Sequence, residues 1–189
     1  MPREKLTEIY QIKLTLRGSK PPIWRRLLVP SDVTLADLHQ IIQAAMGWWD
    51  YHLHQFIIGG MYFSEPQPGY GGWVEMQDER KFRLNQVAPG AKSSFVYEYD
   101  FGDSWEHVIL VEKALPPEPG QVYPLCIKGK RACPPEDVGG VWGYVNFLEA
   151  VQHPEHPQHE DYLEWIGGEF DPEAFDLDEV NAALRALQS

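Results

Sequence analysis

The sequence contains little cysteine and no long hydrophobic run. Its 189 residues include two cysteines, Cys126 and Cys133, too few for the disulfide framework of a small secreted domain. Residues 1–5 are charged and lead directly into a strand-like pattern, which does not resemble a signal peptide, and no segment resembles a membrane span. We therefore expect a cytoplasmic protein that does not contact a membrane.

Basic residues are also scarce. The chain has 16 lysines and arginines against 28 acidic residues, which gives a formal net charge of −12. Proteins that bind nucleic acids usually present a basic surface, because that surface neutralises phosphates. The acidic balance argues against a nucleic acid as the main partner, and a basic block at residues 17–26 allows a small local patch at most.

Two common catalytic motifs are missing. The glycine-rich stretch 69–72 is not followed by the Lys-Ser/Thr pair of a phosphate-binding loop and lacks its strand-to-helix context. The sequence also has no Gly-x-Ser-x-Gly turn of the kind that carries a hydrolase nucleophile. The remaining candidates for catalysis are histidines and carboxylates.

The chain does contain enough apolar residues for a folded core, with 43% hydrophobic and 13% aromatic residues. Residues 9–16 and 23–29 predict two strands. A helix should follow Thr34, because Thr34 can cap it and Asp37 suits its first turn, and Gly47 is well placed to end it. The order so far is strand, strand, helix.

Later segments predict further strands and then helices. We expect strands at residues 51–58 and in an aromatic hairpin at 94–112, with short elements at 73–76 and 81–87. A Pro-rich linker at 115–120 precedes the C-terminal part of the chain. Helices are expected there at 144–151, 162–166 and 177–187.

This order of elements predicts an α+β fold. It is the order of a β-grasp (ubiquitin-like) roll, in which one helix packs across a mixed sheet, followed here by a C-terminal helical extension. Residues 1–114 would form the core. Residues 115–189 would supply the linker, a Cys/Pro loop and the helices, packed on the core as part of one structural domain.

The hairpin holds most of the candidate catalytic residues, and its register decides their role. A loop at 102–104 would place Phe101 opposite Trp105 and His107 in the core, on the face that the apolar pattern favours. A loop of two or four residues would instead place Glu98 opposite His107, a pair suited to acid–base chemistry. The candidate catalytic residues are Asp100, Asp103 and His107, although an aspartate beside a glycine, as at Asp103, is also ordinary turn chemistry.

His52 and His54 suggest a metal site. Residues i and i+2 of a strand point to the same face, so both imidazoles would project together. A carboxylate from the hairpin, Asp100 or Asp103, could complete a site for a divalent metal. The alternative is that the two histidines cap a strand end and form local hydrogen bonds.

Five sequence blocks together resemble the plasmid pRiA4b ORF-3-like family, and the resemblance covers about residues 8–170. The blocks are Pro22–Arg26, Leu38–Trp48, His52–Phe56, Tyr97–His107 and Cys126–Tyr144. The resemblance implies a family without an established activity, found on plasmids, mobile elements and chromosomes of bacteria and archaea. Some of its members carry a transposon-resolvase label, but this sequence has no serine-recombinase nucleophile context.

These features lead to three functional hypotheses. The first is an acidic module that binds a protein or peptide, with Trp105, Glu136 and Asp137 as candidate binding residues and a possible link to mobile elements. Its support comes from aromatic residues that look exposed, namely Trp48, Trp49, Trp73 and Trp142. The alternative is a metal-dependent hydrolase or nuclease that uses the His/Asp cluster. The third is a DNA-binding accessory protein, which the net charge disfavours.

Overall fold

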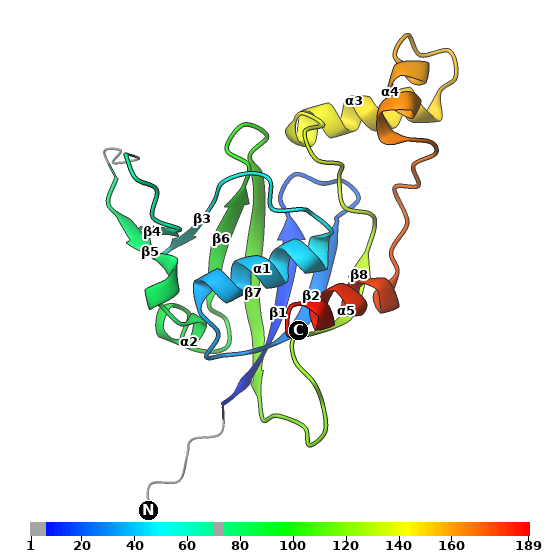
Figure 1. Ribbon diagram of the computed structural model, residues 1–189. Coiled ribbons are helices and arrows are strands. Elements are labelled where there is room, and N and C mark those ends of the chain that lie inside the picture. Colours follow the sequence, from blue (N-terminus) through cyan, green and yellow to red (C-terminus); the bar gives the residue numbers. More distant parts are fainter. Residues whose placement is uncertain (1–6, 70–73) are drawn as a thin grey trace, which may run out of the picture.

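The computed structural model describes residues 7–69 and 74–189, which form one open eight-stranded sheet with helices packed against it (Figure 1). The strand order is β5-β4-β3-β6-β7-β1-β2-β8. The strands are β1 (Ile9–Leu16), β2 (Trp24–Pro30), β3 (His54–Ile58), β4 (Met61–Ser64), β5 (Met76–Asp78), β6 (Ser94–Tyr99), β7 (Trp105–Leu115) and β8 (Leu125–Lys130). The helices are α1 (Leu35–Met46), α2 (Leu84–Val87), α3 (Gly140–Gln152), α4 (His159–Ile166) and α5 (Leu177–Ala186), with a 3-10 turn η1 (Glu79–Lys81). The predicted α+β class is confirmed.

The more specific β-grasp prediction is not confirmed. Among the described strands, every neighbouring pair is antiparallel except β4 and β5 at one edge. The sheet is therefore mixed through that one pair. In Figure 1, α1 crosses one face of the sheet, α5 lies beside it near β8, and α3 and α4 stand beyond one end of the strands. Among the described residues, no helix combines the length and apolar character that crossing a membrane requires.

Helix α1 begins and ends where the sequence predicts. The Thr34 side chain accepts a hydrogen bond from the Asp37 amide, and the Asp37 carboxylate accepts one from the Thr34 amide, each at 3.1 Å. This capping box satisfies amides that have no partner inside the helix. Gly47 ends the helix with φ of 105°, a left-handed conformation that glycine adopts without steric cost.

The β6–β7 hairpin has a longer connection than predicted. Tyr99 pairs with Trp105, so residues 100–104 form a five-residue connection instead of the predicted three. The side chains at odd positions still point into the core, because a change of two residues preserves the face. Phe101 is an exception, since it lies in the connection and is 42% exposed. Glu98 lies opposite Glu106, so the alternative pairing of Glu98 with His107 is wrong.

The C-terminal part contains a strand that the sequence did not predict. Residues 125–130 form β8, the edge strand beside β2. Both backbone groups of Cys126 bond the Asn181 side chain, at 2.8 and 2.9 Å, which joins β8 to α5. The sequence of this segment lacks a clear strand pattern, because half of its residues, including both lysines, are exposed.

Candidate functional site

The structure separates His52 and His54 into two clusters. Strand β3 begins at His54, so His52 lies before it and does not follow the alternation of a strand. The His54 ring turns towards Glu79, with Nε2 at 2.7 Å from Oε2. The His52 ring turns towards the hairpin connection and the segment before α3. The prediction that both imidazoles project together is therefore wrong.

Three carboxylates converge on one nitrogen of His52, and we call these four residues the His52 cluster. His52 Nε2 lies 2.8 Å from Asp137 Oδ1, 3.6 Å from Asp100 Oδ2 and 3.9 Å from Glu136 Oε2. This nitrogen is shielded from solvent and makes no hydrogen bond of good geometry with any described residue, despite the short distance to Asp137. The cluster thus gathers three acids around one imidazole without a conventional hydrogen bond to it.

Neighbouring groups hold two of these carboxylates in place. Glu136 Oε1 accepts hydrogen bonds from the Trp49 amide at 3.0 Å and the Tyr99 hydroxyl at 3.1 Å. Burial, followed by the Glu136 charge, raises the pKa of Tyr99, so its hydroxyl stays a donor. Asp100 Oδ1 accepts from the amides of Gly102 and Asp103 at 2.9 and 3.3 Å. Those amides occupy Oδ1 and leave Oδ2 facing His52.

The backbone is unusual at three aspartates of the two clusters. Asp50, Asp100 and Asp137 have φ of 57°, 60° and 60°, in the left-handed region that side chains other than glycine seldom adopt. Aspartate tolerates this region better than most residues, because its short side chain forms local hydrogen bonds. Such conformations concentrate at functional sites, so we consider the three aspartates as candidate metal ligands.

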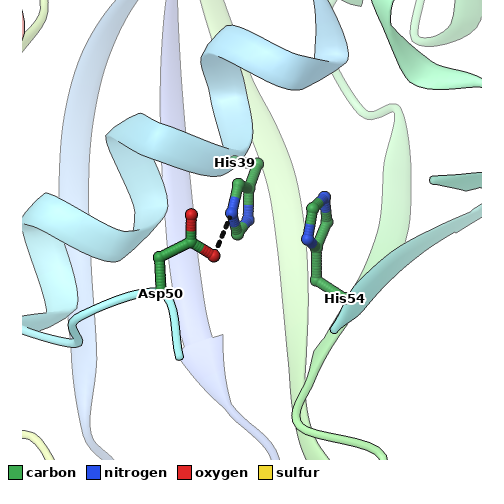
Figure 2. Close-up of side chains that lie close together, drawn as sticks. All are labelled: His39, Asp50 and His54. Carbon is green, nitrogen blue, oxygen red and sulfur yellow. Dashed lines mark hydrogen bonds and ion pairs between the residues drawn. The ribbon is translucent and has the colours of Figure 1, made fainter. Parts of the chain in front are cut away.

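The second group, which we call the stacked histidine cluster, consists of His39, Asp50, His54 and Glu79. Figure 2 shows the rings of His39 and His54 side by side, with Asp50 on the far side of His39. The ring centroids are 3.4 Å apart and the planes differ by 6°. His39 comes from α1, Asp50 follows that helix and His54 opens β3.

Hydrogen bonds fix the protonation of His39. The Gln43 carbonyl accepts from the Asp50 amide at 2.9 Å, so the Gln43 NH2 group donates to the Tyr97 hydroxyl. The Tyr97 hydroxyl then donates to His39 Nδ1, and His39 Nε2 donates to Asp50 Oδ1, each at 2.8 Å. Burial and the nearby His54 lower the pKa of His39 to about 4, against the opposing effect of Asp50. His39 is therefore neutral at pH 7 and uses both ring nitrogens.

Ring geometry distinguishes the two clusters as metal sites. In each cluster, imidazole nitrogens and carboxylate oxygens that could ligate a metal lie within 4.8 Å of one another. A metal ligand must direct its lone pair, which lies in the ring plane, at the ion. Two parallel rings stacked face to face cannot both do so at one ion. His52 and its carboxylates have no such obstacle, so the His52 cluster is the better candidate metal site.

A recess of about 470 Å³ borders the stacked histidine cluster and reaches the His52 cluster through His52 alone, since Asp100, Glu136 and Asp137 do not line it. His52 lines it together with His39 and His54. Its other charged lining residues are Asp37, Asp50, Glu65, Glu79 and Arg80. The recess is therefore acidic and can hold a small ligand or one end of a larger one.

The remaining predicted site residues lie in structural positions. Asp103 Oδ2 accepts from the Gly139 amide at 3.0 Å, which ties the hairpin connection to the start of α3. His107 is fully buried, and neither ring nitrogen makes a hydrogen bond of good geometry with a described residue. Burial lowers the pKa of His107 to about 4. Trp105, predicted as a binding residue, is also fully buried and packs in the core.

The tryptophans predicted to be exposed differ in their surroundings. Trp49 and Trp142 are 73% and 87% exposed. Trp48 is buried, and its indole donates to the Pro134 carbonyl at 3.2 Å. Trp73 lies outside the described residues. Trp49 and Trp142 thus remain available for contact with a partner.

Sequence reasoning missed His39, Asp50 and Glu79. His39 lies on the buried face of α1, where apolar neighbours at helical spacing predict core packing. No spacing along the chain connects Glu79 with His54, because their contact forms across the sheet edge. The one indication in the sequence was a histidine on the apolar face of a helix. A histidine in that position more often packs in the core than belongs to a functional site.

The fold and the two clusters define a mixed α+β protein with a histidine–carboxylate site beside an acidic recess. The family model described as plasmid pRiA4b ORF-3-like protein matches residues 8–179. The chain belongs to this family, as the sequence blocks predicted.

Two relatives extend this comparison. The uncharacterized protein y4hQ of Sinorhizobium fredii (strain NBRC 101917 / NGR234) is 37% identical over 184 residues, which cover 96% of this chain and 93% of the relative. The crystal structure of the protein of unknown function MM3350 from Methanosarcina mazei Go1 is similar, with a TM-score of 0.83 and 40% identity. That match covers 93% of this chain and 98% of the other. Neither name states an activity.

Proposed function

We propose that the His52 cluster binds a divalent cation and that the protein is a metal-dependent hydrolase. The observation that carries the proposal is the convergence of three carboxylates within 4 Å of His52 Nε2. Ligands about 2.1 Å from one ion lie roughly 3.0 Å apart in octahedral and 3.4 Å apart in tetrahedral geometry. Separations of 2.8, 3.6 and 3.9 Å are close to this spacing.

The donor set favours a cation that accepts both nitrogen and oxygen. One imidazole with several carboxylates suits Zn²⁺ or Mn²⁺ better than soft ions, which prefer sulfur. A cation there would also offset the repulsion between the three carboxylates. When bound, such an ion supplies a water of lowered pKa as a nucleophile. Glu136, held by Trp49 and Tyr99, is placed to orient the site.

The charge of the recess favours a substrate other than a nucleic acid. Its acidic lining would repel phosphate groups, and the formal net charge of −12 adds to that effect. The substrate would therefore be neutral or cationic. The neutral His39, with its pKa of about 4, adds no positive charge to the recess at pH 7.

Metal content and thermal stability test whether the His52 cluster binds a cation. We expect purified protein dialysed against Mn²⁺ or Zn²⁺ to retain about one ion, and to melt at a higher temperature with the ion than with EDTA. Asp100→Asn should abolish this shift and still fold, since asparagine tolerates a positive φ and its oxygen can accept the same turn amides. Asp178→Asn, on the surface at the start of α5, is the matched control and should keep the shift.

Assays of hydrolytic activity test whether the protein is a metal-dependent hydrolase. Metal-loaded protein should hydrolyse neutral ester or amide substrates, and Asp100→Asn should lose that activity while Asp178→Asn keeps it. Equal cation binding by wild type and Asp100→Asn would overturn the metal site. A bound cation without hydrolysis of any substrate class would overturn the enzyme.

A second candidate function is protein or peptide binding without catalysis. The observation that favours it is the exposure of Trp49 and Trp142, because large aromatic side chains are enriched where proteins bind partners. A change of both to serine should leave the melting temperature unaltered and abolish capture of the partner. Unchanged capture would exclude these side chains from the interface.

A further inference from the structure

An apolar groove adjoins the acidic recess. It has a volume of about 560 Å³ and shares Leu53, Ser64, Glu65 and Gln67 with the recess. Its apolar lining includes Leu53, Val74, Met76 and Phe101, whose exposed fractions lie between 37% and 52%. Exposure of several large apolar side chains in one concave surface is typical of a binding site.

The groove contains part of β5, the last strand at this edge of the sheet. Met76 and Gln77 line it, and β5 pairs with β4 on one side. Among the described residues, no strand pairs with its other side. An edge strand offers backbone donors and acceptors to an extended chain, and alternate side chains of that chain can fill an adjacent pocket.

Charge restricts what the groove can bind. Its charged lining residues, Glu65 and Glu75, are both acidic, and the adjoining recess adds Asp50 and Glu79. Arg80 lines the recess, but Asp78 pairs with it at 2.9 Å. A ligand with apolar and positively charged groups would complement this surface, and an anionic ligand would be repelled.

We propose that the groove binds an extended peptide with alternating apolar and basic side chains, and that such a peptide is the substrate of this protein. The first part concerns docking alone, and the second rests on the hydrolase proposed above. Leu53 and Phe101, which line the groove, follow His52 and Asp100 directly in the chain, so a docked peptide would lie next to the His52 cluster. Hydrolysis would transfer a water hydroxyl to the peptide carbonyl carbon and a proton to the departing amine.

Fluorescence anisotropy with a labelled, end-blocked hexapeptide of alternating leucine and lysine tests the docking. We expect saturable binding in EDTA, weakened at least about tenfold when glutamate replaces lysine in the peptide. The double change Met76→Ser and Phe101→Ser should weaken binding by a similar factor. Val122→Ser, which alters an apolar side chain of comparable exposure outside the groove, should not affect binding.

Adding the metal ion distinguishes docking of the peptide from its cleavage. Cleavage of the leucine–lysine peptide after addition of Mn²⁺ or Zn²⁺, with loss of cleavage in Asp100→Asn, supports both. Binding in EDTA without cleavage on metal addition keeps the docking site and overturns the peptide as substrate. Equal binding of the lysine and glutamate peptides, or no effect of the groove variants, overturns the docking site and leaves the cation site to its own test.

Discussion

His52 and His54 are separated by one residue, but their surroundings are opposite in character. His54 is buried, stacks on His39 and has a single buried carboxylate partner, Glu79. His52 is partly exposed and faces three carboxylates, and its Nε2 makes no hydrogen bond of good geometry with any residue that the structure describes. In the first cluster each histidine has a hydrogen-bond partner of good geometry, and in the second three carboxylates surround one imidazole.

This contrast shows which cluster contributes to stability and which is available for a ligand. A buried network whose donors and acceptors are all matched stabilises the fold, because any loss leaves a polar group without a partner. An open set of like charges lowers stability until something neutralises it. We therefore expect changes in the stacked histidine cluster to affect folding, and changes in the His52 cluster to affect cation binding.

The largest expected effect is that of His54→Leu. The change leaves the buried Glu79 carboxylate without the imidazole that pairs with it, and an uncompensated buried charge costs about 3–5 kcal/mol. Urea denaturation at pH 7 measures this loss. A loss below about 1 kcal/mol would show that Glu79 reaches solvent or another donor, and would contradict a structural role for the pair.

Acid should destabilise the protein through His39. Its pKa is about 4 in the folded state, below the ordinary value of 6.5, so the unfolded chain binds more protons between these pH values. The stability contribution is complete above about pH 6.5 and is lost as pH falls towards 4, amounting to about 3 kcal/mol. In His39→Gln, the difference in unfolding free energy from wild type should shrink as pH is lowered to 4. A constant difference would contradict the shift.

Tyr97→Phe should have a smaller effect. It removes the hydroxyl that receives the Gln43 amide and donates to His39 Nδ1, which leaves two buried groups without a partner. We expect a loss of about 1–3 kcal/mol in urea denaturation. Phe95, on the same strand, has no hydroxyl, so Phe95→Leu provides a control that removes no hydrogen bond.

The smallest effect on stability is expected for His52→Leu. In EDTA the unfolding free energy should change by less than about 1 kcal/mol, because the ring is partly exposed and lacks a good hydrogen bond. The stabilisation by Mn²⁺ or Zn²⁺ should disappear in the same variant. Differential scanning fluorimetry with and without the cation measures both. A cation response that survives in His52→Leu would assign the ion to another site.

Local patterns allowed much of the fold to be predicted. The capping box at Thr34 and the stop at Gly47 set the ends of α1, and alternation identified β1, β2 and the face of the hairpin. These features depend on residues within a few positions of one another. Strand β8 was missed, because its exposed lysines carry no alternation and its place depends on pairing with β2.

The candidate site was predicted only in part, for the same reason. His52 and Asp100 were both candidates and meet in the structure, 3.6 Å apart. Glu136 and Asp137 were predicted as binding residues, but nothing in their spacing connected them with His52. Asp103 and His107 were plausible by composition, and packing directs them elsewhere.

The sequence by itself determined the α+β class, the ends of α1, the buried face of the hairpin and the family. Hydrogen bonding and burial over a few residues produce those features. Tertiary structure decided that His52 and His54 belong to different clusters, because the chain enters β3 between them and turns the two rings in different directions. It also brought residues 52, 100 and 137 together from three separate segments, and that long-range packing is what creates a possible cation site.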